Sequence, residues 1–210
     1  MIVLLLGPPG AGKGTQGDLL SERLGVPKIA TGDVLRTAVR EGTPMGLAAK
    51  AAMDRGDLVR DEVILGIIKE ALSAPEAARG AILDGVVRTE PQAEGLHRVL
   101  SELGKRLDVV LTFDVPDDEL VRRLGGRTVC GSCQTPYMGK EPGDRCPKCG
   151  GILVRRKDDE PEAIRNRLAV YQRQTAPVVD WYRSDGTRMV AIDAVGTTDE
   201  VLDRALRTLR

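Results

Sequence analysis

A lysine set among glycines near the start of this 210-residue chain is the first group that could do chemistry. The segment GPPGAGKGT, from Gly7 to Thr15, fits the Gly-x4-Gly-Lys pattern of a phosphate-binding loop. The glycines let backbone N–H groups approach an anion closely, and Lys13 supplies a mobile positive charge for the β- and γ-phosphates. The general pattern places Ser or Thr directly after the lysine, whereas here Gly14 intervenes. We interpret this segment as a loop that binds nucleotide phosphates.

Two Cys-x2-Cys pairs, separated by 12 residues, form a second candidate site. Four thiolates in paired turns suit a structural Zn²⁺ site, and a fully sulfur-ligated ion has no open position for catalysis. Two disulfides, or a dithiol redox pair, are the alternatives, and a reducing compartment disfavours the disulfides. The candidate zinc ligands are Cys130, Cys133, Cys146 and Cys149.

Arginines distributed over several segments form a third group of candidates. Phosphoryl transfer between two nucleotides concentrates negative charge, which planar guanidinium groups stabilise and orient. Asp158 and Asp159 are either a solvated acidic turn or the groups that orient these arginines. The arginines are Arg36, Arg88, Arg123, Arg127, Arg156 and Arg167.

The composition limits the classes of function. There are 31 basic and 31 acidic side chains, so the zero net charge implies no bulk attraction to nucleic acid or to an anionic membrane. No apolar run is long enough to span a membrane, and the first residues are typical of a strand rather than a signal peptide. We expect a cytoplasmic protein without nucleic-acid or membrane partners.

Strands alternating with helices are predicted to position these groups. The five apolar residues before the phosphate loop are typical of a strand buried on both faces, and the whole pattern predicts an α/β fold with a parallel sheet of about five strands. We expect Thr31 or Asp33 to cap one helix and Asp61 another. Asp84, at the end of the second buried strand, would hold water around Mg²⁺. The predicted strands are 2–6, 28–30, 81–85, 108–115 and 189–193; the main predicted helices are 13–24, 44–54, 91–103, 117–124, 160–182 and 198–209.

Several motifs together resemble an adenylate kinase, and the resemblance runs along nearly the whole chain. These motifs are GPPGAGKGTQ (7–16), ATGDVLR (30–36), DGVVRTEPQ (84–92), LGGRTVC (124–130), RRKDDEPEAIRNRL (155–168) and QTAPVVDWY (174–182). The glycine after the lysine also fits this family, and the cysteine segment resembles its long, zinc-bearing lid.

The resemblance implies transfer of the terminal phosphoryl group of Mg-ATP to AMP, giving two ADP, by a monomer with a three-layer P-loop fold. It implies a core of residues 1–29, 60–125 and 159–210, an AMP-binding segment of 30–59 and a zinc-binding lid of 126–158. Implied ATP contacts are Gly10, Ala11, Gly12, Lys13, Gly14, Thr15, Arg123, Arg127, Pro136, Tyr137 and Gly196. Implied AMP contacts are Thr31, Arg36, Asp57, Leu58, Val59, Gly85, Val86, Val87, Arg88, Gln92, Arg156 and Arg167. Implied catalytic residues are Lys13, Arg36, Arg88, Arg123, Arg156 and Arg167.

One departure and three alternatives accompany this prediction. Val86-Val87 replaces the Phe-Pro that the family usually carries before the arginine, so the backbone there is expected to differ and the AMP site to be altered. A UMP/CMP-type kinase shares the fold, but Thr31, Thr89 and the long lid favour AMP. The second alternative is a P-loop binding protein without activity, and the complete set of arginines argues against it. A zinc-ribbon module for nucleic acid would need a basic, aromatic face that this segment lacks.

Overall fold

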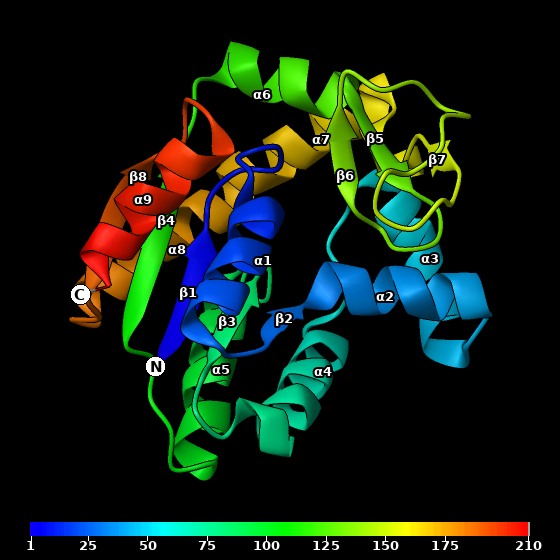
Figure 1. The fold of residues 1–210 in the computed structure, drawn as a ribbon. Helices are drawn as coiled ribbons and strands as arrows, with labels where there is room; N and C mark the ends of the chain where they lie inside the picture. Colours follow the sequence, from blue (N-terminus) through cyan, green and yellow to red (C-terminus); the bar gives the residue numbers. More distant parts are fainter. Residues whose placement is uncertain (210) are drawn as a thin grey trace.

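Five parallel strands form the central sheet, in the order β2-β3-β1-β4-β8 (Figure 1). The computed structural model describes residues 1–209. The predicted parallel α/β sheet is therefore confirmed, with each strand within a residue or so of its predicted bounds. The strands are β1 (Ile2–Leu6), β2 (Lys28–Ala30), β3 (Ala81–Asp84), β4 (Val109–Asp114) and β8 (Met189–Asp193).

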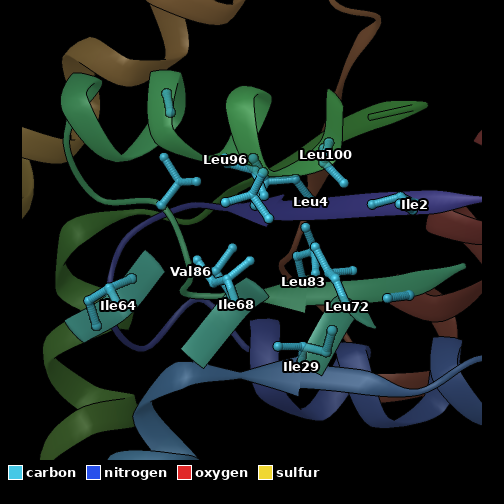
Figure 2. Packing of buried hydrophobic residues seen from close by; sticks show 14 of the residues in the cluster. Ile2, Leu4, Ile29, Ile64, Ile68, Leu72, Leu83, Val86, Leu96 and Leu100 are labelled. Carbon is cyan, nitrogen blue, oxygen red and sulfur yellow. The ribbon is translucent and has the colours of Figure 1, made fainter. Parts of the chain in front are cut away.

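Helices cover both faces of this sheet, which makes β1 the centre of the core. One face packs on α4, α5 and α8, and Figure 2 shows Leu96 of α5 beside Leu4 and Leu72 of α4 beside Leu83. The other face packs on α1 and α9. Because both faces are covered, every residue of β1 is buried, as its apolar run predicts. The helices are α1 (Lys13–Leu24), α2 (Thr31–Glu41), α3 (Pro44–Arg55), α4 (Asp61–Ser73), α5 (Glu90–Glu102), α6 (Asp117–Gly125), α7 (Pro161–Val170), α8 (Ala176–Ser184) and α9 (Thr198–Thr208).

The helix caps predicted at Thr31, Asp33 and Asp61 are wrong. Thr31 is the first residue of α2 rather than its cap, and its hydroxyl donates to the Gly85 carbonyl, 3.0 Å away. Asp33 and Asp61 lie in the first turns of α2 and α4, where a negative side chain favours the positive end of the helix dipole. The Thr31 hydroxyl is used in a contact with a distant loop rather than in capping the helix, and the local sequence does not reveal that contact.

The helix predicted over 160–182 is interrupted. A π-helical turn, η3 (Tyr171–Thr175), separates α7 from α8. Pro177 gives the physical reason, because its nitrogen cannot donate to the preceding turn and its ring crowds the carbonyl four residues earlier. The wider turn relieves this conflict and directs Thr175 inward.

A second, three-stranded antiparallel sheet lies beyond α6 and forms the lid, at the end of the molecule nearest α2 and α3 in Figure 1. Its strands are β5 (Arg127–Cys130), β6 (Pro136–Met138) and β7 (Leu153–Val154), and a 3-10 turn, η2 (Lys157–Asp159), follows. Its small core consists of Cys130, Cys146 and Leu153. So little buried apolar surface is insufficient to hold a module of this size together.

No helix within residues 1–209 combines the length and the apolar character needed to cross a membrane.

Candidate functional site

The glycine loop between β1 and α1 forms a cradle closed by Lys13. Gly10 and Gly12 have φ values of 88° and 89°, which only glycine adopts without strain. The Lys13 ammonium donates to the carbonyls of Gly7 (2.7 Å) and Pro8 (2.9 Å), so the side chain folds back over the loop. Burial lowers the pKa of Lys13 to about 8, and the nearby Asp84 carboxylate opposes this shift. A bound phosphate would supply the counter-charge that the buried lysine lacks.

Asp84 ends β3 directly beside this loop. A Cβ at Gly14 would lie 3.4 Å from the Asp84 carboxylate, which is an ordinary contact distance, so the glycine that departs from the general motif lies next to Asp84. Burial raises the pKa of Asp84, while the charges of Lys13 and Lys28 oppose the rise. Lys28 was not among the predicted site residues. From the first position of β2, its ammonium forms an ion pair with Asp18 (2.6 Å) and donates to the carbonyl of Gly14 in the loop (3.4 Å). No sequence motif points to these contacts.

A cleft of about 990 Å³ runs from the phosphate loop to the lid. Its walls come from the loop, from α6, from the lid strands and from the start of α9. Tyr137 lies on the lid side of the cleft, where its hydroxyl and the Cys146 sulfur are 3.1 Å apart. The structure brings together in this cleft every residue predicted to contact ATP: Gly10, Ala11, Gly12, Lys13, Gly14, Thr15, Arg123, Arg127, Pro136, Tyr137 and Gly196.

A smaller cavity of about 60 Å³ lies beside the cleft, under α2 and α4. Arg36 and Val87 line the neighbouring cleft instead, and the side chain of Val86 lines neither because it is fully buried in the core. The predicted AMP residues that do line the smaller cavity are Thr31, Asp57, Leu58, Val59, Gly85, Arg88, Gln92, Arg156 and Arg167.

Three arginines, Arg88, Arg156 and Arg167, line both cavities and so stand at their junction. Arg156 donates two hydrogen bonds to Asp158, of 2.9 and 2.7 Å. Arg167 donates to the Asp158 carbonyl and to the Asp159 carboxylate. The two aspartates therefore orient arginines, as the second of the two sequence-based interpretations of this turn proposed, and do not form a solvated acidic turn.

The charges of this cluster are strongly coupled. Burial alone would raise the pKa of Asp158, but the charges of Arg156 and Arg167 outweigh it and hold that pKa well below its usual range. Burial lowers the pKa of Arg167 to about 10, and Asp158 opposes that shift. Both groups are ionised at neutral pH, so the junction combines fixed positive and negative charges.

The remaining predicted arginines are also held by acidic partners. Arg36 pairs with Asp33 on the same helix. Arg123 donates to Glu119 (2.7 Å) and to the carbonyl of Ala194 (3.0 Å), which directs its guanidinium across the cleft.

Hydrogen bonds on both sides of Arg88 fix the segment in which Val86-Val87 replaces Phe-Pro. The Arg88 N–H donates to Gln92 Oε1 (2.7 Å), and the Arg88 carbonyl accepts from the Thr175 hydroxyl (2.8 Å). Within residues 1–209 there is no cis peptide bond, and Val87 is 1% exposed. Sequence reasoning missed Thr175 as a functional position, because its contact depends on the π-helical turn.

The four cysteines converge at one end of the lid. Their sulfurs all lie within 4.8 Å of one another, and all four thiols are free. A Cβ at Gly151 would lie 2.9 Å from the Cys130 sulfur, so only glycine fits behind this cluster. Four converging thiols without disulfides fit a tetrahedral Zn²⁺ site of the closed, structural type.

Sequence comparisons agree with this arrangement. The family model described as adenylate kinase matches residues 5–187. An adenylate kinase of Gemmatimonas aurantiaca is 66% identical over 100% of this chain and 99% of the relative. An adenylate kinase of Syntrophotalea carbinolica is 52% identical over 89% of this chain and 88% of the relative, and one of Methanosarcina barkeri is 46% identical over 100% and 99%. Identity at this level over the full length establishes that this chain belongs to the adenylate kinase family.

Proposed function

We propose that the protein reversibly transfers the terminal phosphoryl group of Mg-ATP to AMP, giving two ADP. The observation that carries this proposal is the position of Arg88, Arg156 and Arg167 at the junction of two cavities of different size. A single nucleotide site does not need arginines that face two chambers. Donor and acceptor phosphates that meet at that junction need such arginines. Their combined negative charge must be neutralised, and the reacting groups must be held in line.

The larger cleft is assigned to ATP. Lys13 and the loop from Gly10 to Thr15 would hold the β- and γ-phosphates, with the N-terminus of α1 contributing its dipole. Arg123 and Arg127 would contact the same phosphates, and the lid pair Pro136-Tyr137 together with Gly196 would surround the rest of the nucleotide.

The smaller cavity, together with the adjoining part of the cleft that Arg36 lines, is assigned to AMP. The arginines that line the cavity suit the α-phosphate, and its apolar residues suit the base. Arg36 and Arg88 would hold that phosphate. Thr31, the segment from Asp57 to Val59, the backbone from Gly85 to Val87, and Gln92 would surround the nucleoside. The catalytic contribution of Lys13, Arg36, Arg88, Arg123, Arg156 and Arg167 is then positioning and charge stabilisation, since the transfer needs little covalent help from the protein.

Two metals accompany this activity. Mg²⁺, bound with ATP, neutralises charge on the transferred group, and the buried Asp84 beside the loop is the residue that fits an outer contact through water. Structural Zn²⁺ on the four cysteines would contribute about 10 kcal/mol to the folding of the lid, whose apolar core is too small by itself. The chain would then divide into a core (1–29, 60–125 and 159–210), an AMP-binding segment (30–59) and a lid (126–158).

We also propose that the protein acts as a monomer in the cytoplasm, with ATP, AMP and ADP as its partners. Its zero net charge supports an absence of nucleic-acid and membrane partners.

A coupled assay with Mg-ATP and each of AMP, GMP, UMP and CMP tests the proposal. Turnover with AMP well above the other three is expected. Preference for UMP or CMP would support the pyrimidine alternative, and no turnover with any acceptor would support the non-catalytic one. Either result would refute the main proposal.

A further inference from the structure

The side-chain amide of Gln92 is held between one donor and one acceptor. Its Oε1 accepts from the Arg88 N–H (2.7 Å), and its Nε2 donates to Asp61 Oδ1 (2.6 Å). A backbone N–H can only donate and a carboxylate only accepts, so these partners permit a single orientation of the amide. Gln92 is 1% exposed, so water is not a ready substitute for either partner.

The same amide faces the smaller cavity with its hydrogen-bonding capacity only half used. A primary amide has two N–H donors and an oxygen with two lone pairs, so one donor and one acceptor remain. The surrounding wall is apolar and suits a flat ring, with Leu35, Met53, Leu58, Val59 and Ile64 contributing to it. Arg88, Arg156 and Arg167 line the same cavity. The amide is thus placed to read the edge of a base whose phosphate is held by the arginines.

The orientation of such an amide decides which purines fit. The 6-aminopurine edge offers a donor at the exocyclic N6 and an acceptor at N1, whereas the 6-oxopurine edge offers an acceptor at O6 and a donor at N1. An amide held in one orientation can match only one of these patterns for a base in a given pose. Reading the other pattern requires exchanging the amide oxygen and nitrogen.

We propose that Asp61 is a positioning residue that sets the acceptor specificity, by fixing the Gln92 amide so that it reads a 6-aminopurine and rejects a 6-oxopurine. This inference rests on the proposed function, which makes AMP the acceptor. Exchanging the amide ends would set Nε2 against the Arg88 N–H and Oε1 against the Asp61 carboxylate, losing both hydrogen bonds and creating two repulsive contacts. Asp61 supplies one of the two hydrogen bonds that fix the amide, and it is not among the residues that line either cavity.

Three variants separate this role from a structural one. Asp61→Leu removes the acceptor at similar size. Asp61→Asn keeps a carbonyl oxygen that can accept from Nε2. Glu62→Leu is the matched control. Glu62 is exposed in the same first turn of α4, and its substitution removes a negative charge from the same end of the helix dipole. The readouts are kcat, KM for AMP, KM for ATP, and kcat/KM for inosine monophosphate, a 6-oxopurine without a 2-amino group.

For Asp61→Leu we expect KM for AMP to rise about tenfold or more, with KM for ATP unchanged, since a buried hydrogen bond to a charged group is lost. The kcat/KM ratio of inosine monophosphate to AMP should rise about tenfold. Asp61→Asn and Glu62→Leu should stay within about threefold of the parent protein. Unchanged purine discrimination in Asp61→Leu, or an Asp61→Asn variant that behaves like Asp61→Leu, would overturn the inference.

The outcomes also distinguish this inference from the proposed function. A parent protein that does not use AMP refutes the proposed function, whatever the variants do. A parent protein that uses AMP, with Asp61→Leu unchanged, refutes only the role of Asp61. Should Asp61→Leu fail to fold, Asp61→Ala replaces it, and equilibrium binding of AMP alone and of ATP alone gives the same comparison.

Discussion

Arg127 on lid strand β5 and Asp159 in the η2 turn form a two-pronged ion pair, with Nε–Oδ2 and Nη2–Oδ1 distances of 2.7 and 2.5 Å. The Asp159 side chain is 2% exposed, and the same carboxylate accepts from Arg167 of α7 at 2.9 Å. One buried carboxylate therefore links the lid strand to the helix that follows the lid. Asp159 lies 32 residues from Arg127 and 8 residues from Arg167 in the sequence. The sequence suggests Asp159 as a group that could orient the arginines, but it does not identify which arginines it pairs with.

Asp159→Asn is expected to lower the free energy of unfolding by about 3 kcal/mol, because it leaves two arginines without their buried counter-charge while preserving the shape of the side chain. Urea unfolding measures the change. Asp180→Asn is the matched control, since the Asp180–Arg183 pair is largely exposed and should change stability by less than about 0.5 kcal/mol. Equal effects of the two substitutions would contradict a special role for the buried pair.

Lys13→Met is expected to reduce kcat at least about 10²-fold while the fold persists, because the charge aimed at the transferred phosphates is lost and its apolar stem is kept. Steady-state kinetics and circular dichroism together measure this. Lys69→Met serves as the control, since Lys69 is exposed and forms an exposed ion pair with Glu102. A kcat for Lys13→Met near that of the control would refute the assignment.

ATP binding is expected to take up a proton at alkaline pH. In the free protein the pKa of Lys13 is about 8, because the ammonium is buried, whereas bound phosphates favour the charged form. Below pH 8 the lysine is already protonated and affinity should hardly change. Above pH 8 the free protein loses that proton, so affinity should fall toward tenfold per pH unit.

Calorimetric titration at pH 9 in two buffers of different ionisation enthalpy counts the protons taken up. The expected value is close to one in the parent protein and close to zero in Lys13→Met. Equal values in both proteins would show that another group takes up the proton.

About one zinc per chain is expected from elemental analysis, and Cys130→Ser should lower both the zinc content and the melting temperature. Ser132→Ala, in the same Cys-x2-Cys turn, should retain the metal. Metal-free protein with two disulfides would overturn the zinc assignment, and chelation should destabilise the parent protein but leave Cys130→Ser nearly unaffected.

Local patterns sufficed to predict the sheet, the phosphate loop and the cysteine cluster. The apolar run 2–6, the glycines around Lys13 and the Cys-x2-Cys pairs each carry their meaning within a few residues, so no tertiary contact is needed to recognise them. The same holds for the end of the first helix, predicted at residue 24, where Gly25 follows in the left-handed conformation.

The contacts that orient the site could not be predicted in this way. Thr175 reaches Arg88 across 87 residues of sequence, and Asp61 reaches Gln92 across 31. Neither pairing follows from helix propensity or hydrophobic periodicity, because each joins residues of two different elements that only the tertiary fold brings together. The prediction that Thr31 caps a helix failed for the same reason, because its hydroxyl donates instead to the distant Gly85 carbonyl.

Asp158 and Asp159 already pair with Arg156 and Arg167 at the junction, so nucleotide binding there, as proposed, would be an exchange of anions. Phosphate oxygens would displace the carboxylates from these two arginines, and the contacts given up would offset much of the attraction. When product leaves, the carboxylates would return and stabilise the empty site. These two carboxylates would thus limit the affinity for substrates and for products alike. Such a balance suits a reversible reaction in which substrates and products carry the same phosphates.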